Sequence, residues 1–195
     1  MLRGFVCFLA NIVRIVLPCK IYGKENITKN NTVYMCNHLS IIDVFILVAH
    51  LPLNTHFIAK KEVFKNKLFS WVLKNLRVFP IDRGTADLKA IKYACNLLKD
   101  GKNLMIFPQG TRKNKPEIAL EEIHTGTGMF ALKNQSTVIP MMFKDKPGFF
   151  KKNTLYIGKA LDMSEFEGKK ANSLVLDEFT KKACEAMNGL LEANK

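Results

Sequence analysis

The feature that most constrains the fold of this chain is an alternation that begins after Pro18. Short runs rich in Val, Ile, Thr, Tyr and Phe alternate with longer stretches of helical periodicity. This alternation is typical of α/β folds, in which helices cover a central sheet. The pattern predicts strands at residues 32–36, 56–59, 78–81, 103–107, 138–143 and 154–157. It predicts helices at residues 41–49, 64–76, 86–98, 128–134 and 173–192, with a surface loop at 113–125.

The length of the chain favours one domain. A chain of 195 residues can bury a core of its own, and this one contains no internal repeat, low-complexity tract or linker. We therefore expect a single α/β domain over residues 20–195, with a central mixed sheet flanked by helices.

Residues 1–19 form a distinct N-terminal segment. On a helical wheel its apolar residues cover a broad face, and Arg3, Cys7, Asn11 and Arg14 share the narrow opposite side. Asn11 and Arg14 interrupt the apolar stretch and no cleavage pattern follows it, so we interpret the segment as retained. It predicts an amphipathic helix that lies on a membrane with its arginines towards lipid phosphates. The alternative is a helix packed on the domain's own core, which usually has a narrower apolar stripe.

The charge of the chain is strongly positive. Thirty Lys and Arg against 17 Asp and Glu leave a net charge of +13, which attracts polyanions such as anionic lipid, phosphorylated metabolites, acidic carrier proteins or nucleic acid. No run approaches the roughly 18 apolar residues of a membrane-spanning helix. The five cysteines are odd in number and form no C-x-x-C pair, which argues against a disulfide framework and predicts a reducing location facing the cytosol. Without a Cys or His cluster, no metal site is expected.

The first segment that suggests chemistry is residues 37–43, between a predicted strand and a predicted helix. A histidine can take a proton near neutral pH, and a carboxylate at its other ring nitrogen orients it and stabilises the imidazolium. His38 and Asp43 have this composition. The alternative is structural, because Ser40 and Asp43 also have the spacing of a helix capping box.

Two further segments place arginines after predicted strands. Residues 107–112 read Phe-Pro-Gln-Gly-Thr-Arg, and Gly110 allows the backbone to approach a ligand closely. Residues 78–84 end with Arg83 and a glycine. An arginine presents a planar fork that suits phosphate, so Arg83 and Arg112 predict a phosphate-bearing substrate beside a general base. For each arginine alone, the alternative is a surface ion pair.

These segments together resemble a known family. Four ordered blocks are similar to those of the glycerolipid acyltransferases. They are His38 to Asp43, the Phe-Pro-Ile-Asp-Arg that ends at Arg83, residues 107–112, and the Val-Ile-Pro that ends at Pro140. The closest resemblance is to the 1-acyl-sn-glycerol-3-phosphate (lysophosphatidate) acyltransferase branch, over roughly residues 20–160. It implies that residues 20–195 are an acyltransferase domain, which moves a fatty acyl group to the free hydroxyl of lysophosphatidate and forms phosphatidate in phospholipid synthesis.

The resemblance also implies roles for individual residues. His38 would be the general base and Asp43 its orienting partner. Arg83 and Arg112 would hold the acceptor phosphate, with Gly110 and Thr111 shaping the same wall. Pro140 would lie on the acyl-donor side. No cofactor is implied, because acyl-CoA or acyl-carrier protein serves as the co-substrate.

One residue departs from the family pattern, because Gln109 stands where the family usually has Glu. Glutamine keeps the length and one acceptor oxygen, so it can position a neighbour but cannot act as an acid or base. We therefore expect Gln109→Glu to change acceptor affinity more than the chemical step.

Other classes of function remain as alternatives. The charge alone would suit a nucleic-acid binder, but the lysines are scattered and no reading module is recognisable, so no nucleic-acid partner is expected. A non-catalytic peripheral lipid-binding protein, or an acyltransferase for another lysolipid, also fits. Cys36 lies in an apolar strand, which favours a core residue over a nucleophile.

The expected location is the cytoplasmic face of an anionic membrane, as a peripheral or monotopic protein. The predicted helix at 64–76 carries Trp71 among lysines, which is typical of helices that dock on anionic membranes. We hypothesise that this helix and residues 1–17 form one membrane-facing surface. The alternative is an ordinary amphipathic helix with solvated lysines.

Overall fold

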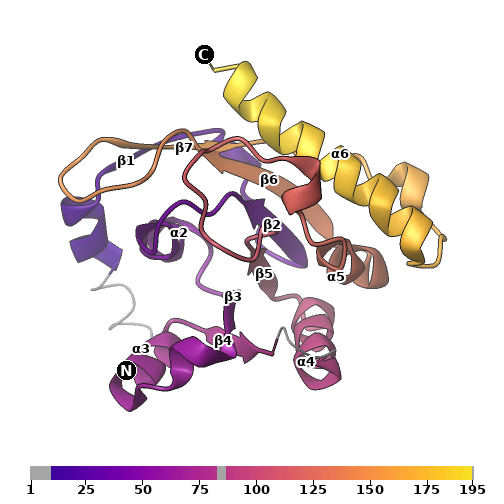
Figure 1. Cartoon of the computed structure of the whole chain (residues 1–195), viewed down its shortest axis with the longest axis horizontal. Coiled ribbons are helices and arrows are strands. Elements are labelled where there is room, and N and C mark those ends of the chain that lie inside the picture. Colours follow the sequence, from indigo (N-terminus) through magenta and orange to yellow (C-terminus); the bar gives the residue numbers. More distant parts are fainter. Residues whose placement is uncertain (1–9, 83–86, 195) are drawn as a thin grey trace.

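The computed structural model of the chain describes residues 10–82 and 87–194 (Figure 1). Its strands are β1 Cys19–Tyr22, β2 Thr32–Cys36, β3 Thr55–Lys60, β4 Val78–Ile81, β5 Asn103–Ile106, β6 Thr137–Phe143 and β7 Asn153–Ile157. Its α-helices are α2 Ile42–His50, α3 Lys67–Asn75, α4 Leu88–Lys99, α5 Thr127–Asn134 and α6 Ser173–Glu192. Short 3-10 helices are η1 Lys24–Asn26, η2 Lys61–Phe64, η3 Leu120–Glu122 and η4 Ser164–Phe166.

The strands form one mixed sheet in the order β1-β7-β6-β2-β5-β3-β4. β6 and β7 pair antiparallel, whereas the other neighbouring pairs are parallel. Parallel neighbours need long crossover connections, and the helices between the strands provide them. The predicted fold, a single α/β domain with a central mixed sheet flanked by helices, is confirmed.

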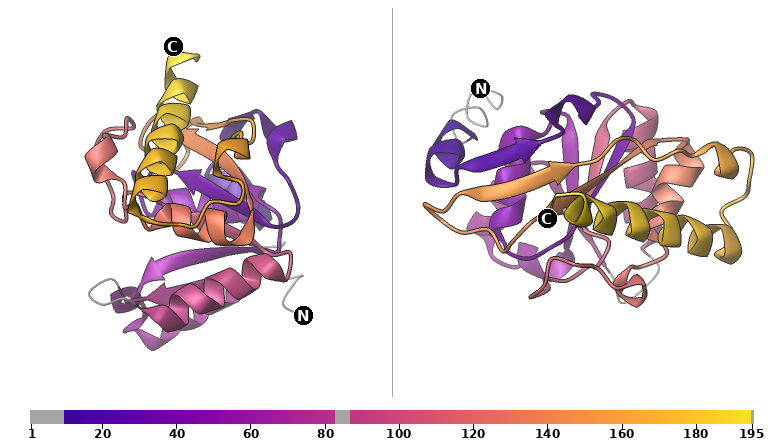
Figure 2. Two further views of the ribbon diagram at one scale, coloured as in Figure 1. Left: turned by 90° about the vertical axis from the view of Figure 1, so that its right-hand side faces the viewer. Right: turned by 90° about the horizontal axis from the view of Figure 1, so that it is seen from above.

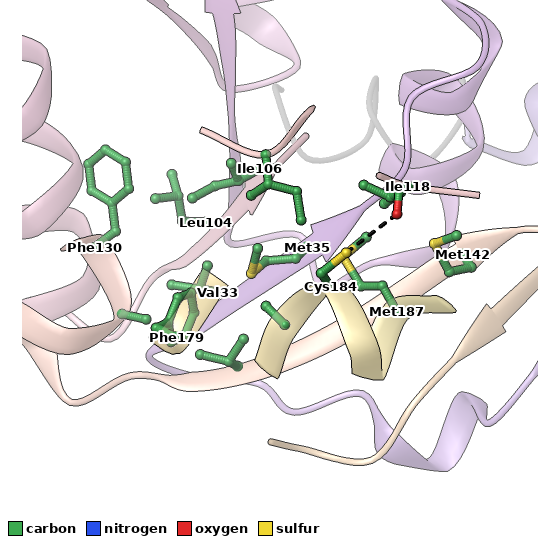
Figure 3. Close-up of a cluster of buried hydrophobic side chains, with 14 of the residues drawn as sticks. Val33, Met35, Leu104, Ile106, Ile118, Phe130, Met142, Phe179, Cys184 and Met187 are labelled. Carbon is green, nitrogen blue, oxygen red and sulfur yellow. Dashed lines mark hydrogen bonds between the residues drawn. The ribbon is translucent and has the colours of Figure 1, made fainter. Parts of the chain in front are cut away.

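Both faces of the sheet are buried, as the side chains of β2 show. Val33 and Met35 point to a core that α4, α5 and α6 complete, and Tyr34 and Cys36 point to a second core beneath α2 and α3. Successive side chains of a strand point to opposite faces, so a central strand covered by helices on both sides is apolar throughout. Figure 3 shows the first of these cores, and Figure 1 shows the two groups of helices on opposite sides of the sheet.

Most predicted elements match the structure within a few residues. Strands 32–36 and 78–81 and helix 173–192 have the predicted bounds, and α3 begins three residues later than expected, after η2. The segment 113–125 is mostly loop but contains η3. The sequence analysis missed β1, because four residues carry too little pattern and its partner β7 is remote in the sequence.

The N-terminal segment is helical over residues 10–16, and residues 1–9 lie outside the described residues. Ala10 and Leu17 are buried, whereas Ile12 and Ile15 are exposed. Arg14 Nη2 donates a hydrogen bond of 2.6 Å to the carbonyl oxygen of Ala49, near the end of α2. One side of this helix is therefore packed on the domain and the other is exposed, and Arg14 contacts α2. Within the described ranges, no helix has the length and apolar character needed to cross a bilayer.

Candidate active site

Two of the predicted motifs follow neighbouring strands of the sheet: His38 and Asp43 come after β2, and residues 107–112 come after β5. β2 and β5 are parallel, with Met35 opposite Ile106. The segments that follow these strands, residues 37–43 and 107–113, therefore leave the sheet side by side at its carboxyl edge. This edge is where open α/β sheets bind ligands.

His38 and Asp43 are in contact. His38 Nδ1 lies 2.9 Å from Asp43 Oδ2, the carboxyl is fully buried, and the imidazole is largely buried. Since the carboxylate accepts the Nδ1 proton, Nε2 is the ring nitrogen whose lone pair can take a proton. The geometry is that of a general base and its orienting group.

The same carboxylate shapes the loop that carries His38. Asp43 Oδ2 also accepts hydrogen bonds from the backbone N–H groups of Leu39, at 2.6 Å, and Ser40, at 2.9 Å. The bond from the Ser40 amide is half of the capping box that the spacing suggested, whereas Ser40 Oγ accepts from the Ile42 amide instead. Asp43 thus closes the turn before α2 and contacts His38, so the structural and the catalytic interpretation describe one geometry.

The segment after β5 holds His38 from the other side. The Phe107 ring stacks on the imidazole, with centroids 4.1 Å apart and planes inclined by 19°. Gln109 Oε1 accepts from the backbone N–H of His38 at 3.2 Å, and the backbone N–H of Lys113 donates to the His38 carbonyl at 2.7 Å. Ring stacking and two backbone contacts fix the position of the loop, and Asp43 fixes the rotation of the ring.

Gln109 is itself held by a carboxylate. Its Nε2 donates to Glu122 Oε2 at 2.8 Å, and Lys113 Nζ lies 2.8 Å from Glu122 Oε1. Hydrogen bonds from Lys113 and Gln109 lower the pKa of Glu122. The sequence analysis assigned no role to Glu122, because it lies in a segment without a clear period. The amide of Gln109 therefore bridges the Glu122 carboxylate and the backbone of the proposed base.

A cavity of about 260 Å³ lies next to this histidine. It brings together His38, Gly110, Thr111 and Arg112, four of the residues predicted from the sequence. Most of its remaining lining is apolar and comes from α2, β3, η2, α3, β4 and residues next to α2, α3 and β5, with the side chains Ile41, Val44, Phe45, Phe57, Ile58, Ala59, Val63, Leu73, Leu76, Val78 and Phe107. Lys60, at the end of β3, adds a cation that the sequence analysis had not assigned to the site. The cavity can therefore hold an apolar chain next to a histidine and an arginine.

Gly110 adopts a backbone conformation that favours glycine. Its φ is 65°, in the left-handed region that most side chains avoid, and its amide donates to the Phe107 carbonyl at 2.9 Å. This tight turn directs the chain from β5 past the cavity to Arg112. Phe107 and Gly110 also line a second cavity of about 280 Å³, which lies against α4 and α5.

Two predicted site residues are not placed at this cavity. Arg83 lies outside the described residues. Pro140 is buried within β6, where it pairs with Met35, and it does not line either of the two cavities described above. The apolar wall near His38 comes instead from α2, β3 and α3.

Cys36 is the last residue of β2 and lies two residues before His38. Burial raises the pKa of the Cys36 thiol well above its usual range, and Cys36 Sγ lies 3.6 Å from Asn37 Oδ1. A thiol held neutral in this way is a poor nucleophile. In the part of the chain that the structure describes, no three His, Cys, Asp or Glu side chains are grouped as metal ligands would be.

Comparisons with known proteins show what this chain is similar to. The chain is 33% identical over 170 residues to a 1-acyl-sn-glycerol-3-phosphate acyltransferase of Bacillus subtilis, covering 82% of this chain and 83% of that protein. A protein of the same name from Borreliella burgdorferi is 26% identical over 82% of this chain and 69% of its own length. One from Cocos nucifera is 30% identical over 73% of this chain and 46% of its own length.

A solved structure shares the fold. The crystal structure of PlsC, the 1-acyl-sn-glycerophosphate acyltransferase of Thermotoga maritima, superposes with a TM-score of 0.73 at 22% identity, covering 99% of this chain and 79% of that one. The Acyltransferase family model matches residues 18–144, which include His38, Asp43 and the cavity-lining segment 107–112. From this match, and from the relatives that share most of its length, we conclude that the chain belongs to the Acyltransferase family.

Proposed function

We propose that this protein transfers a fatty acyl group from a thioester donor to the free hydroxyl of lysophosphatidate and forms phosphatidate. The observation that carries the proposal is the contact between His38 and Asp43 beside an apolar cavity that Arg112 also lines. The names of the relatives and membership of the Acyltransferase family support the same reaction.

In this proposal His38 acts as the general base and Asp43 orients it. His38 Nε2 removes the proton of the acceptor hydroxyl as its oxygen attacks the thioester carbonyl. A new ester C–O bond forms and the C–S bond breaks. The imidazolium, which the Asp43 carboxylate stabilises, returns the proton to the departing thiolate. No acyl-enzyme is needed, because both substrates meet at the same histidine.

The acceptor phosphate and the acyl chain have separate places in this proposal. Arg112 holds the phosphate, since a guanidinium can donate two parallel hydrogen bonds to it, and by resemblance Arg83 adds a second contact. Gly110 and Thr111 line the same wall. The apolar lining of the cavity accommodates an acyl chain. The donor is acyl-CoA or acyl-carrier protein, both acidic and suited to a chain of charge +13.

The proposed place of action is the surface of an anionic membrane on its cytoplasmic side. The acceptor and the product are lipids that reside in the bilayer, and a positively charged protein is attracted to anionic headgroups. The helix at residues 10–16 presents Ile12 and Ile15 to the outside. Membrane lipid and the acyl donor are therefore the proposed partners.

The experiment that tests this function is transfer of a radiolabelled acyl group to lysophosphatidate in detergent micelles. Acyl-CoA and acyl-carrier protein are supplied in separate arms. We expect label in phosphatidate with the native chain, and a loss of about a hundredfold to ten-thousandfold in His38→Ala, because a positioned general base contributes a rate enhancement of this order.

His56→Ala is the matched control, because His56 lies near the start of β3, at the opposite edge of the sheet. It should keep near-native activity. If label is transferred only to another lysolipid, that lysolipid replaces lysophosphatidate as the proposed acceptor. If the native chain transfers no label with either donor and any acceptor, the catalytic proposal is wrong and a lipid-binding role takes its place.

A further inference from the structure

An exposed apolar patch lies where the N-terminal helix meets the loop between β6 and β7. It consists of Ile12, Ile15, Phe149 and Phe150, whose exposed fractions are 42%, 77%, 62% and 82%. The backbone N–H of Phe150 donates to the Val16 carbonyl at 2.9 Å, which joins the loop to the end of the helix. Figures 1 and 2 show the loop, in orange, beside the indigo helix from different directions. Soluble monomers rarely expose such a group of large apolar side chains without a binding role.

The loop holds its two phenylalanines outward by specific contacts. Asn153 is buried, and its side chain accepts from the Gly148 amide at 2.9 Å and donates to the carbonyl oxygens of Gly148 and Pro18. Phe150 has a φ of 53°, a left-handed conformation that is unfavourable for a large side chain. A residue that is both strained and exposed adds little to folding, and strain of this kind gathers at functional segments.

The loop is also basic. Residues 144–152 contain four lysines and one aspartate around a Pro-Gly-Phe-Phe tip, and the lysines at 144, 146, 151 and 152 are exposed. Aromatic side chains at a tip with lysines on both flanks match an anionic bilayer, in which rings enter the acyl boundary and ammonium groups stay among phosphates.

The sheet places this patch at the edge that carries the candidate active site. Asn37, next to His38, exchanges two hydrogen bonds with the backbone of Phe143, the last residue of β6. β7 starts at the same edge because it runs antiparallel to β6, and β1 begins there too, with Cys19 opposite Asn153. The C-terminal end of the N-terminal helix and the β6–β7 loop therefore lie at the edge of the sheet that carries the candidate active site.

We propose that this patch is a membrane-docking surface for anionic bilayers, in which the β6–β7 loop inserts Phe149 and Phe150 beside the N-terminal helix. The surface holds the active-site edge against the lipid that contains the substrate. It deepens the proposed function, but its binding to vesicles can be measured without any catalytic activity.

The test is co-sedimentation of the full chain with phosphatidylcholine vesicles that contain or lack phosphatidylglycerol. Phe149→Ala and Phe150→Gly should each weaken binding to the anionic vesicles by about tenfold or more, since each removes a ring from the acyl boundary. Phe150→Gly should keep or raise the melting temperature, because glycine relieves the left-handed strain and the lost ring was exposed. Lys151→Gln with Lys152→Gln should reduce the preference for phosphatidylglycerol.

The control is Leu174→Ala, which removes a side chain that is 72% exposed on α6, over the opposite face of the sheet. It should bind vesicles like the native chain. Native binding by both phenylalanine variants would overturn the proposal, as would equal weakening by Leu174→Ala. A change in oligomeric state without a change in vesicle binding would assign the patch to a second copy instead.

Activity separates this proposal from the proposed function. On a short-chain lysophosphatidate dissolved as monomers, the phenylalanine variants should turn over at the native rate, whereas on vesicles they should be slower. If the native chain transfers no acyl group at all, the proposed function is wrong. The vesicle-binding measurements then still show whether the docking surface exists.

Discussion

At the scale of single residues, one carboxylate serves structure and chemistry together. Asp43 closes the turn before α2 through two backbone amides and contacts the ring of His38 with the same oxygen. The sequence showed two spacings for Asp43: its spacing from Ser40 suited a capping box, and its spacing from His38 suited a catalytic pair. The three contacts of Oδ2 show why the two interpretations did not exclude each other.

Gln109 gives a prediction at this scale. Its side chain points to Glu122 and to the His38 backbone and does not line the cavity next to His38, so the contacts change the expectation that Gln109→Glu acts on acceptor affinity. The new carboxylate would lie against Glu122, and like charges at this distance repel. We expect kcat to fall about tenfold with little change in KM for the acceptor, equal to about 1.4 kcal/mol in the barrier.

The double variant Gln109→Glu with Glu122→Gln tests the cause. It restores one amide and one carboxylate to the pair, so it should recover most of the lost kcat. A double variant no more active than Gln109→Glu alone would show that Glu122 does not position this segment. Steady-state kinetics with both substrates varied distinguishes these results.

At the scale of secondary-structure elements, the strands decide which loops meet. The motifs at residues 37–43 and 107–112 each follow a strand, and because β2 and β5 are neighbours the loops after them share one cavity. The helices α2 and α3 contribute most of its apolar wall together with β3 and β4. Periodicity identified the helices but could not show that their apolar side chains would face His38.

Helix α3 gives a prediction at this scale. Leu68 and Trp71 are exposed on it, and Trp71 is the one tryptophan of the chain. If α3 docks on a membrane, as its lysines and aromatic residues suggest, anionic vesicles should shift Trp71 emission to shorter wavelength, because the indole leaves water. Leu68→Gln should reduce the shift. An unchanged spectrum in the presence of bound vesicles would leave α3 in water and limit docking to the patch at the β6–β7 loop.

At the scale of the whole molecule, the pH dependence of stability follows from two histidines. Burial, with the charges of Arg14 and Lys24, lowers the pKa of His50 from 6.5 to about 4, and burial also lowers the pKa of His56. Between pH 6.5 and about pH 4 the unfolded chain therefore binds more protons at His50 than the folded chain does. The stability that the neutral His50 contributes is fully present above pH 6.5 and is lost as the pH falls towards 4.

Urea unfolding at about pH 7 and about pH 5 measures this loss. Allowing for partial exposure of the ring, His50 should account for a loss of about 1 kcal/mol. His50→Gln should flatten the dependence, because glutamine does not titrate. The pKa values of four carboxyl groups are lowered, so the stability that these groups contribute is lost only at lower pH than the loss due to His50. They are the carboxyl groups of Glu62, Asp87, Glu122 and Asp162. A native chain equally stable at both pH values would contradict the prediction.

The sequence by itself determined the fold class, most of the elements and the family. Alternating strand and helix patterns depend on neighbouring residues, and the four motif blocks are each contiguous or nearly so. The pairing of His38 with Asp43 was also accessible, since only four residues lie between them, where the loop after β2 leads into α2. These features depend on residues that are close together in the chain, so they can be recognised without knowing the tertiary structure.

Only the tertiary structure decided what lies beside these motifs. Glu122 reaches Gln109 from a segment without a pattern, Pro140 is buried within a strand, and β1 exists because β7 pairs with it. Phe149 and Phe150 can be proposed as part of a docking surface only because β1 and β7 bring the end of the N-terminal helix and the β6–β7 loop to one edge of the sheet. Contacts between remote segments depend on how the strands order themselves, and the pattern within each segment does not encode that order.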